Sequence, residues 1–226
     1  MVIPPSRVFR VGKTPDAWRR RPPSRGSTPM FNRYDDPLGI YHTVYAASTK
    51  YGAYMETLAP LRPAPSVDLA TTVMENDPAL RATLPPGSIR NWIERRHIGA
   101  ATIQGTSVDV GSSESIAYLR HRLASRFSAL GVTDFDLHAL TTARREVTME
   151  ISRCIFELEY REQRRFDGIR YPSRLGMNIS CWAIFEDDDP ACIMNKQSQP
   201  VDLTDPELIE ALQHSRISLI PIAEAS

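Results

Sequence analysis

Three side chains in the N-terminal third of the chain, those of Arg33, Tyr45 and Glu56, could together form one polar site. Tyr45 lies near the end of an expected strand, and Glu56 follows eleven residues later on the next expected helix. Taken singly, each has an ordinary structural explanation, because a loop arginine is usually solvated, a strand tyrosine usually packs and a helix glutamate usually lies at the surface. A shared site therefore has to be argued from the pattern of the whole chain.

The signatures of several enzyme classes are missing from the sequence. There is no GxGxxG or GxxxxGK[ST] phosphate loop, no HExxH or zinc-deaminase pattern, and no GxSxG nucleophile elbow. The three cysteines, Cys154, Cys181 and Cys192, include no CxxC pair, which argues against a disulfide framework and against a structural zinc site. We therefore expect no bound metal, and the cysteine pattern suits a reducing cytoplasm.

Charge and hydropathy exclude further classes of function. The 27 Lys and Arg residues balance 27 Asp and Glu residues, so no overall positive field would hold nucleic acid or an anionic membrane. No apolar run approaches the roughly twenty residues that span a bilayer, and residues 1–10 lack the features of a signal peptide. We expect a cytoplasmic protein that by itself binds neither nucleic acid nor membrane.

The periodicity of apolar residues predicts both strands and helices. A helix is expected from the N-cap Ser48 to about Leu58, before a group of prolines. Further helices are expected over residues 112–131, 135–140, 145–159 and 204–214, and strands over residues 6–11, 38–47, 66–73, 92–93, 98–103, 169–171, 178–185 and 217–222. This mixed order predicts a single α+β domain with mixed, mostly antiparallel sheets flanked by helices, and not a doubly wound sheet.

Several short segments occur in an order that resembles one protein family. They are Arg-Val-Phe-Arg at 7–10, Phe-Asn-Arg at 31–33, Gly-Ile-Tyr-His-Thr-Val-Tyr-Ala-Ala-Ser at 39–48, Tyr-Met-Glu-Thr-Leu at 54–58, Asp-Gly-Ile-Arg-Tyr-Pro-Ser-Arg at 167–174 and the strand at 177–185. With the spacing from Tyr45 to Glu56, they resemble the RES-domain family, named for its Arg, Glu and Ser positions. The family often has Gly-Gly-Arg followed by an aromatic residue and Asn, whereas this chain has Phe-Asn-Arg-Tyr-Asp at 31–35. The residue equivalent to the family arginine is therefore Arg33 or a residue one or two positions from it.

The resemblance implies a fold related to that of ADP-ribosyltransferases, in one domain over residues 1–226. Residues 7–185 carry the likeness, and residues 186–226 add a C-terminal helix and strand. It also implies a toxin that cleaves NAD⁺ as its substrate, without a separate cofactor, and that is paired with an Xre-type antitoxin. The acceptor stays open between water, phosphate and a protein target, the last making the chain a mono-ADP-ribosyltransferase. The chain could also be a non-catalytic binding protein of the same fold, or an exported effector.

The resemblance also implies roles for individual residues. Arg10 and Arg33 would hold the diphosphate of NAD⁺, because a guanidinium presents a planar fork of donors to phosphate oxygens. Tyr45 would stack on the nicotinamide or hydrogen-bond the ribose, and Glu56 would stabilise the positive charge that develops when the nicotinamide–ribose bond breaks. Ser173 would hydrogen-bond the ribose or a phosphate, or else serve as a turn hydroxyl. Tyr171 and Arg174 are further candidates.

Overall fold

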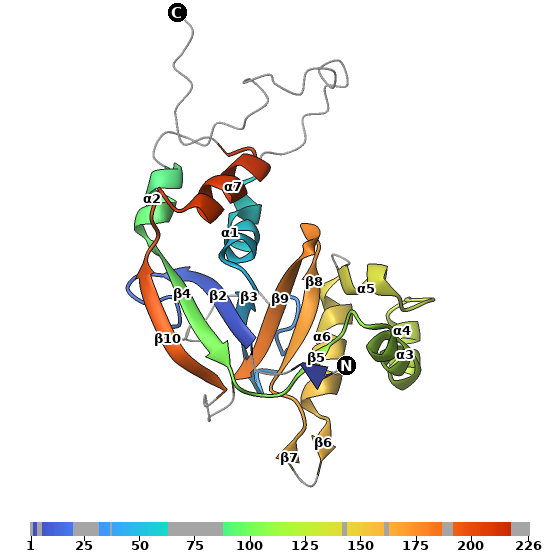
Figure 1. Cartoon of the computed structure of the whole chain (residues 1–226). Coiled ribbons are helices and arrows are strands. Elements are labelled where there is room, and N and C mark those ends of the chain that lie inside the picture. Colours follow the sequence, from blue (N-terminus) through green and yellow to red (C-terminus); the bar gives the residue numbers. More distant parts are fainter. Residues whose placement is uncertain are drawn as a thin grey trace, which may run out of the picture.

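An eight-stranded mixed sheet lies at the centre of the protein (Figure 1). This computed structural model describes residues 2–3, 6–19, 32–36, 38–62, 88–141, 144–160, 163–186 and 192–217. The strands of the sheet are β1 (Val2–Ile3), β2 (Ser6–Lys13), β3 (His42–Ala47), β4 (Arg96–Ile103), β5 (Ser107–Asp109), β8 (Gly168–Ser173), β9 (Gly176–Glu186) and β10 (Ile193–Pro200). Their order is β1-β5-β8-β9-β3-β2-β4-β10, and every neighbouring pair is antiparallel except β5 and β8.

Helices lie at one end of the strands and beside β8, so the expected α+β class is confirmed (Figure 1). The C-terminal helix packs along the helix that follows β3, and the four helices over residues 113–156 lie beside β8. In chain order the helices are α1 (Lys50–Leu58), the 3₁₀ turn η1 (Ala59–Leu61), α2 (Ser88–Glu94), α3 (Ser113–Arg122), α4 (Ala124–Ala129), α5 (Leu137–Thr141), α6 (Arg145–Phe156) and α7 (Pro206–His214). A separate hairpin joins β6 (Glu159–Tyr160) to β7 (Gln163–Arg164).

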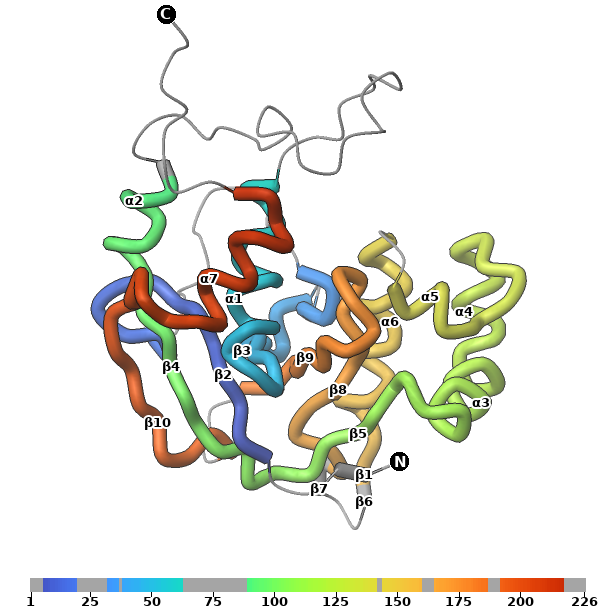
Figure 2. Tube along the Cα trace, turned by 45° about the horizontal axis from the view of Figure 1, so that its top comes forward, coloured from blue at the N-terminus to red at the C-terminus, as the bar shows by residue number. Residues whose placement is uncertain are grey.

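The two central strands β2 and β3 meet at one point and then separate. Between them only Phe9 and Ala47 are paired, whereas β2 pairs with β4 along its whole length and β3 with β9 along its whole length. The sheet therefore has two parts, β1-β5-β8-β9-β3 and β2-β4-β10, joined at this pair. Figure 2 shows β2 running beside β4 while β3 runs beside β9.

Alternating side chains of the strands enter two apolar cores, one on each face. The larger core contains Leu58 of α1, Ile151 of α6 and Leu208 of α7, all fully buried. The smaller core contains Trp182 of β9 and is covered by Trp18, whose indole N–H donates to the carbonyl of Gln197 at 3.0 Å. The large core thus fastens α1 to the sheet beside the point where the strands separate.

Helix α1 is held at its start by polar contacts. The hydroxyl of Thr49 accepts from the backbone N–H of Gly52 at 3.0 Å, so Thr49 is the N-cap in place of the expected Ser48. The carboxylate of Glu207 on α7 accepts from the backbone N–H of Tyr51 at 3.0 Å. Asp205, the N-cap of α7, accepts from the Tyr54 hydroxyl at 3.2 Å. These contacts set the position of α1, which carries Glu56.

Several element boundaries differ from the sequence prediction. The strand expected from residue 38 begins at His42, because the Asp36 carboxylate accepts from the backbone N–H groups of Leu38 and Ile40 and forms a turn. Residues 92–93 lie in helix α2, and Leu123 divides the helix expected over residues 112–131 into α3 and α4. The strands β1, β5, β6, β7 and β10 were not expected, and the helix expected over residues 145–159 ends at Phe156. The strand expected over residues 66–73 and residues 218–222 of the last one lie outside the described residues.

Candidate active site

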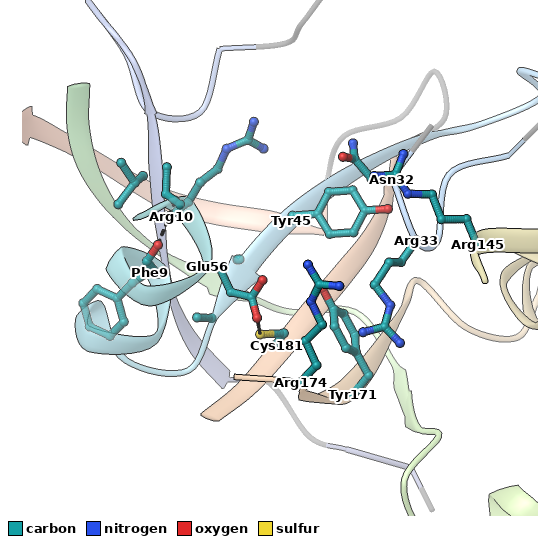
Figure 3. A pocket seen from close by; sticks show the side chains of 15 residues that line it. Phe9, Arg10, Asn32, Arg33, Tyr45, Glu56, Arg145, Tyr171, Arg174 and Cys181 are labelled. Carbon is teal, nitrogen blue, oxygen red and sulfur yellow. Dashed lines mark hydrogen bonds between the residues drawn. The ribbon is translucent and has the colours of Figure 1, made fainter. Parts of the chain in front are cut away.

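A pocket of about 460 Å³ opens where β2 and β3 separate (Figure 3). Its wall comes from both parts of the sheet and from α1, the segment before β3, the start of α6 and the turn after β8. This volume lies in the range of small-molecule sites, roughly 300–1,000 Å³. The lining side chains include four arginines and one carboxylate: Arg10, Arg33, Arg145, Arg174 and Glu56.

Glu56 projects from α1 into this pocket and is held by two donors (Figure 3). The Ser173 hydroxyl donates to its Oε1 at 2.5 Å, and the Cys181 thiol donates to the same oxygen at 3.5 Å. Among the described residues no hydrogen bond reaches Oε2. One carboxylate oxygen is therefore fixed by the protein, and the other remains available to a bound molecule.

Ser173 lies behind Glu56 and does not line the pocket. Its side chain is buried, with 2% of its surface exposed. Its hydroxyl donates to Glu56 and accepts from the backbone N–H of Leu175 at 2.9 Å in the turn between β8 and β9. The expected direct contact of Ser173 with ribose or phosphate has no support in this geometry, because both partners of the hydroxyl are protein groups. Ser173 orients Glu56 and also serves as the turn hydroxyl.

Tyr45 lines the pocket with its ring, while its hydroxyl is engaged by the segment before β3. The hydroxyl donates to Asp35 Oδ1 at 2.8 Å and accepts from the backbone N–H of Tyr34 at 2.9 Å. Burial, followed by the charge of Asp35, raises the pKa of Tyr45 well above its ordinary value. The Tyr45 hydroxyl therefore stays protonated and anchors the segment that carries Arg33, which leaves the ring face for contact with a ligand.

Replacing Tyr45 by Phe is expected to lower the free energy of unfolding by about 1–3 kcal/mol, because it leaves Asp35 and the Tyr34 N–H without their shared partner. Urea denaturation of the purified variant measures this change. Tyr118→Phe is the matched control, since the Tyr118 side chain on α3 is exposed, and it should stay within about 0.5 kcal/mol of the wild type. Equal stabilities of the two variants would contradict the anchoring role.

Arg33 is fixed between two aromatic rings and a backbone carbonyl. Its guanidinium carbon lies 5.9 Å from the ring centroids of both Tyr34 and Tyr171, and its Nη2 donates to the carbonyl of Leu140. Such cation–π contacts hold the flat guanidinium in one orientation. The structure thus brings Arg33 into the same pocket as Tyr45 and Glu56.

Arg10 comes from β2 on the other side of the opening. In Figure 3 the Tyr45 ring lies between the guanidinium groups of Arg10 and Arg33. Burial lowers the pKa of Arg10 from its ordinary value, and the negative charges of Glu186 and Asp16 partly oppose this effect. Arg10 remains charged at neutral pH, since an arginine does not lose its proton in proteins. The two arginines expected at the diphosphate therefore line the pocket from different directions.

Three further lining residues were not assigned a clear role from the sequence. Arg145 begins α6, and Arg174 lies in the turn after β8; both are exposed at the pocket. Cys181 lies on β9 and contacts Glu56 directly. The sequence signal for Arg174 was its place after Ser173, whereas nothing in the sequence marked Arg145 or Cys181.

Comparison with known families decides the relationship. The family model described as "RES domain" matches residues 5–205. The chain belongs to the RES-domain family. The match extends beyond the likeness seen over residues 7–185 and includes β10 and the N-cap of α7. A search of curated proteins finds no match.

Membership of the RES-domain family is consistent with an NAD-related enzymatic activity and with an NAD-related toxin. In the described part of this RES protein, no helix has the length and apolar character needed to cross a membrane. Within the same residues, no group of three or more His, Cys, Asp and Glu side chains is arranged to hold a metal ion.

Proposed function

We propose that this RES-domain protein cleaves the nicotinamide–ribose bond of NAD⁺ and acts as a toxin by depleting it. The observation that carries the proposal is the charge of the pocket wall, where one oriented carboxylate, Glu56, stands among four arginines. NAD⁺ has the complementary charges, because its diphosphate is anionic and its nicotinamide ring is cationic. Arginines suit the diphosphate, and a carboxylate suits the sugar carbon next to the cationic ring.

The lining side chains would take different parts of NAD⁺. Arg10 and Arg33 hold the diphosphate oxygens, and the Tyr45 ring stacks on the nicotinamide. The Tyr45 hydroxyl keeps its bonds to Asp35 and Tyr34, so it holds the wall and takes no part in the reaction. Glu56 then faces the ribose through Oε2.

The bond between C1′ and the pyridine nitrogen breaks heterolytically. The electron pair of this bond goes to the nitrogen, so nicotinamide leaves as a neutral molecule, and C1′ acquires oxocarbenium character. The negative charge of Glu56 stabilises this cation electrostatically. An acceptor oxygen then bonds to C1′: a water molecule adds and releases its proton to the medium, giving ADP-ribose, or a phosphate adds and gives the phosphorylated sugar.

Incubation of the purified protein with NAD⁺, with and without inorganic phosphate, tests this proposal. Chromatography should show release of nicotinamide together with ADP-ribose, or with its phosphate when phosphate is present. Label from NAD⁺ that appears on a protein band after incubation with cell lysate would instead indicate mono-ADP-ribosyl transfer. If NAD⁺ is left intact in every condition, the chain is a non-catalytic binding protein and the proposal is wrong.

A neutralising partner follows from such an activity, since free consumption of NAD⁺ would harm the cell that makes the enzyme. We propose that this partner is an Xre-type antitoxin protein. Expression of the chain alone should arrest growth, and co-expression of a small helical Xre-like protein from the neighbouring reading frame should restore it. Neighbouring secretion genes without such a protein would favour an exported effector.

A further inference from the structure

Cys181 lines the pocket and contacts the Glu56 carboxylate. It lies on β9, where it is paired with Ala47 of β3 on one side and with Tyr171 of β8 on the other. Only 1% of its surface is exposed, although it lines the pocket. The strand order therefore places one thiol next to Glu56, between the strands that carry Tyr45 and Tyr171.

The Cys181 thiol acts as a hydrogen-bond donor to Glu56. Its sulfur lies 3.5 Å from Glu56 Oε1. Burial, followed by the charge of Glu56, raises the pKa of Cys181 well above its ordinary value. The thiol is therefore protonated at neutral pH, so Cys181 donates its proton to the carboxylate and does not act as a thiolate nucleophile.

We propose that Cys181 is a positioning residue for Glu56, in which the neutral thiol and the Ser173 hydroxyl together fix Oε1 and direct Oε2 toward the substrate. This inference rests on the proposed cleavage of NAD⁺. A glutamate side chain has three rotatable bonds, and one donor still allows the carboxylate to turn about its bond to that donor. Two donors from different strands, β8 and β9, bind Oε1 from two directions and restrict this rotation before the substrate binds.

The kinetic test compares two Cys181 variants with a matched cysteine control. Cys181→Ala should lower kcat for NAD⁺ cleavage about tenfold, the effect of one lost hydrogen bond, while KM stays within about twofold because the diphosphate contacts persist. Cys181→Ser restores a donor and should recover part of kcat. Cys154→Ala, a buried cysteine of α6 outside the pocket wall, should behave as the wild type.

Infrared spectroscopy of the unliganded protein tests the same contact without relying on catalysis. The S–H stretching band lost in Cys181→Ala should lie at lower frequency than the band lost in Cys154→Ala, and it should move when Glu56 is replaced by Ala. A Cys181 band that Glu56→Ala leaves in place, or wild-type kcat in folded Cys181→Ala, would overturn the inference. If the wild type cleaves no NAD⁺ but the band moves, the contact stands and only the proposed reaction is wrong. If Cys181→Ala does not fold, the kcat of Cys181→Ser and the S–H band of Glu56→Ala still test the contact between Cys181 and Glu56.

Discussion

Replacement of Glu56 by Gln is expected to lower the rate of NAD⁺ cleavage about 10³-fold while the protein stays folded. Gln has the size and shape of Glu, so its amide oxygen can occupy the place of Oε1 and still accept from Ser173 and Cys181. The amide NH₂ then takes the place of Oε2. A neutral donor group would face the developing cation at C1′ in place of a negative charge, and the transition state loses its main electrostatic stabilisation.

Single-turnover release of nicotinamide measures this effect, and thermal unfolding confirms the fold. The matched control is Glu210→Gln, because Glu210 is an exposed helix glutamate on α7 outside the pocket wall. The control should cleave NAD⁺ at the wild-type rate. Wild-type cleavage by purified Glu56→Gln would show that another group stabilises the cation.

The part of the site that the sequence could predict is the part built from neighbouring elements. Tyr45 lies on β3, and α1 follows this strand after a short turn capped by Thr49. A strand followed at once by a helix that packs back on the sheet brings their side chains together. The eleven-residue spacing between Tyr45 and Glu56, together with the likeness to the RES family, therefore predicted that both line one pocket.

The rest of the site depends on which distant strands become neighbours. Strand β9 lies between β3 and β8, and this order alone brings Cys181 and Ser173 to Glu56. The apolar pattern of β9 shows that it is central but not which strands flank it. The likeness to the RES family pointed to Ser173, but its burial behind the carboxylate was visible only in three dimensions.

Strand β10, at eight residues the longest of the unexpected strands, shows why periodicity can miss a strand. Its sequence from Ile193 to Pro200 is mostly polar, and Ile193 is its one buried residue. The backbone hydrogen bonds of its antiparallel pairing with β4 hold the strand in place. The pattern of its side chains contributes little to this pairing. Edge strands with two solvated faces have no alternation to read, so periodicity cannot detect them.

The Arg33→Lys variant is expected to raise KM for NAD⁺ roughly ten- to a hundredfold with a smaller change in kcat. Lysine retains the charge but replaces the planar fork by one ammonium group, so bidentate contact with the diphosphate is lost. Lysine also lacks the flat group that lies near the rings of Tyr34 and Tyr171 while donating to the Leu140 carbonyl. The ammonium would therefore be less firmly placed before NAD⁺ arrives.

Initial rates over a range of NAD⁺ concentrations separate the two constants. Arg126→Lys is the matched control, because Arg126 lies on α4 in an exposed ion pair with Glu150 and is not part of the pocket wall. An unchanged KM in Arg33→Lys would mean that Arg33 stabilises the pocket wall and does not bind the diphosphate. The same assay on Arg10→Lys tests the second arginine proposed for the diphosphate, and Arg145→Lys and Arg174→Lys test the two arginines that line the pocket without a proposed contact.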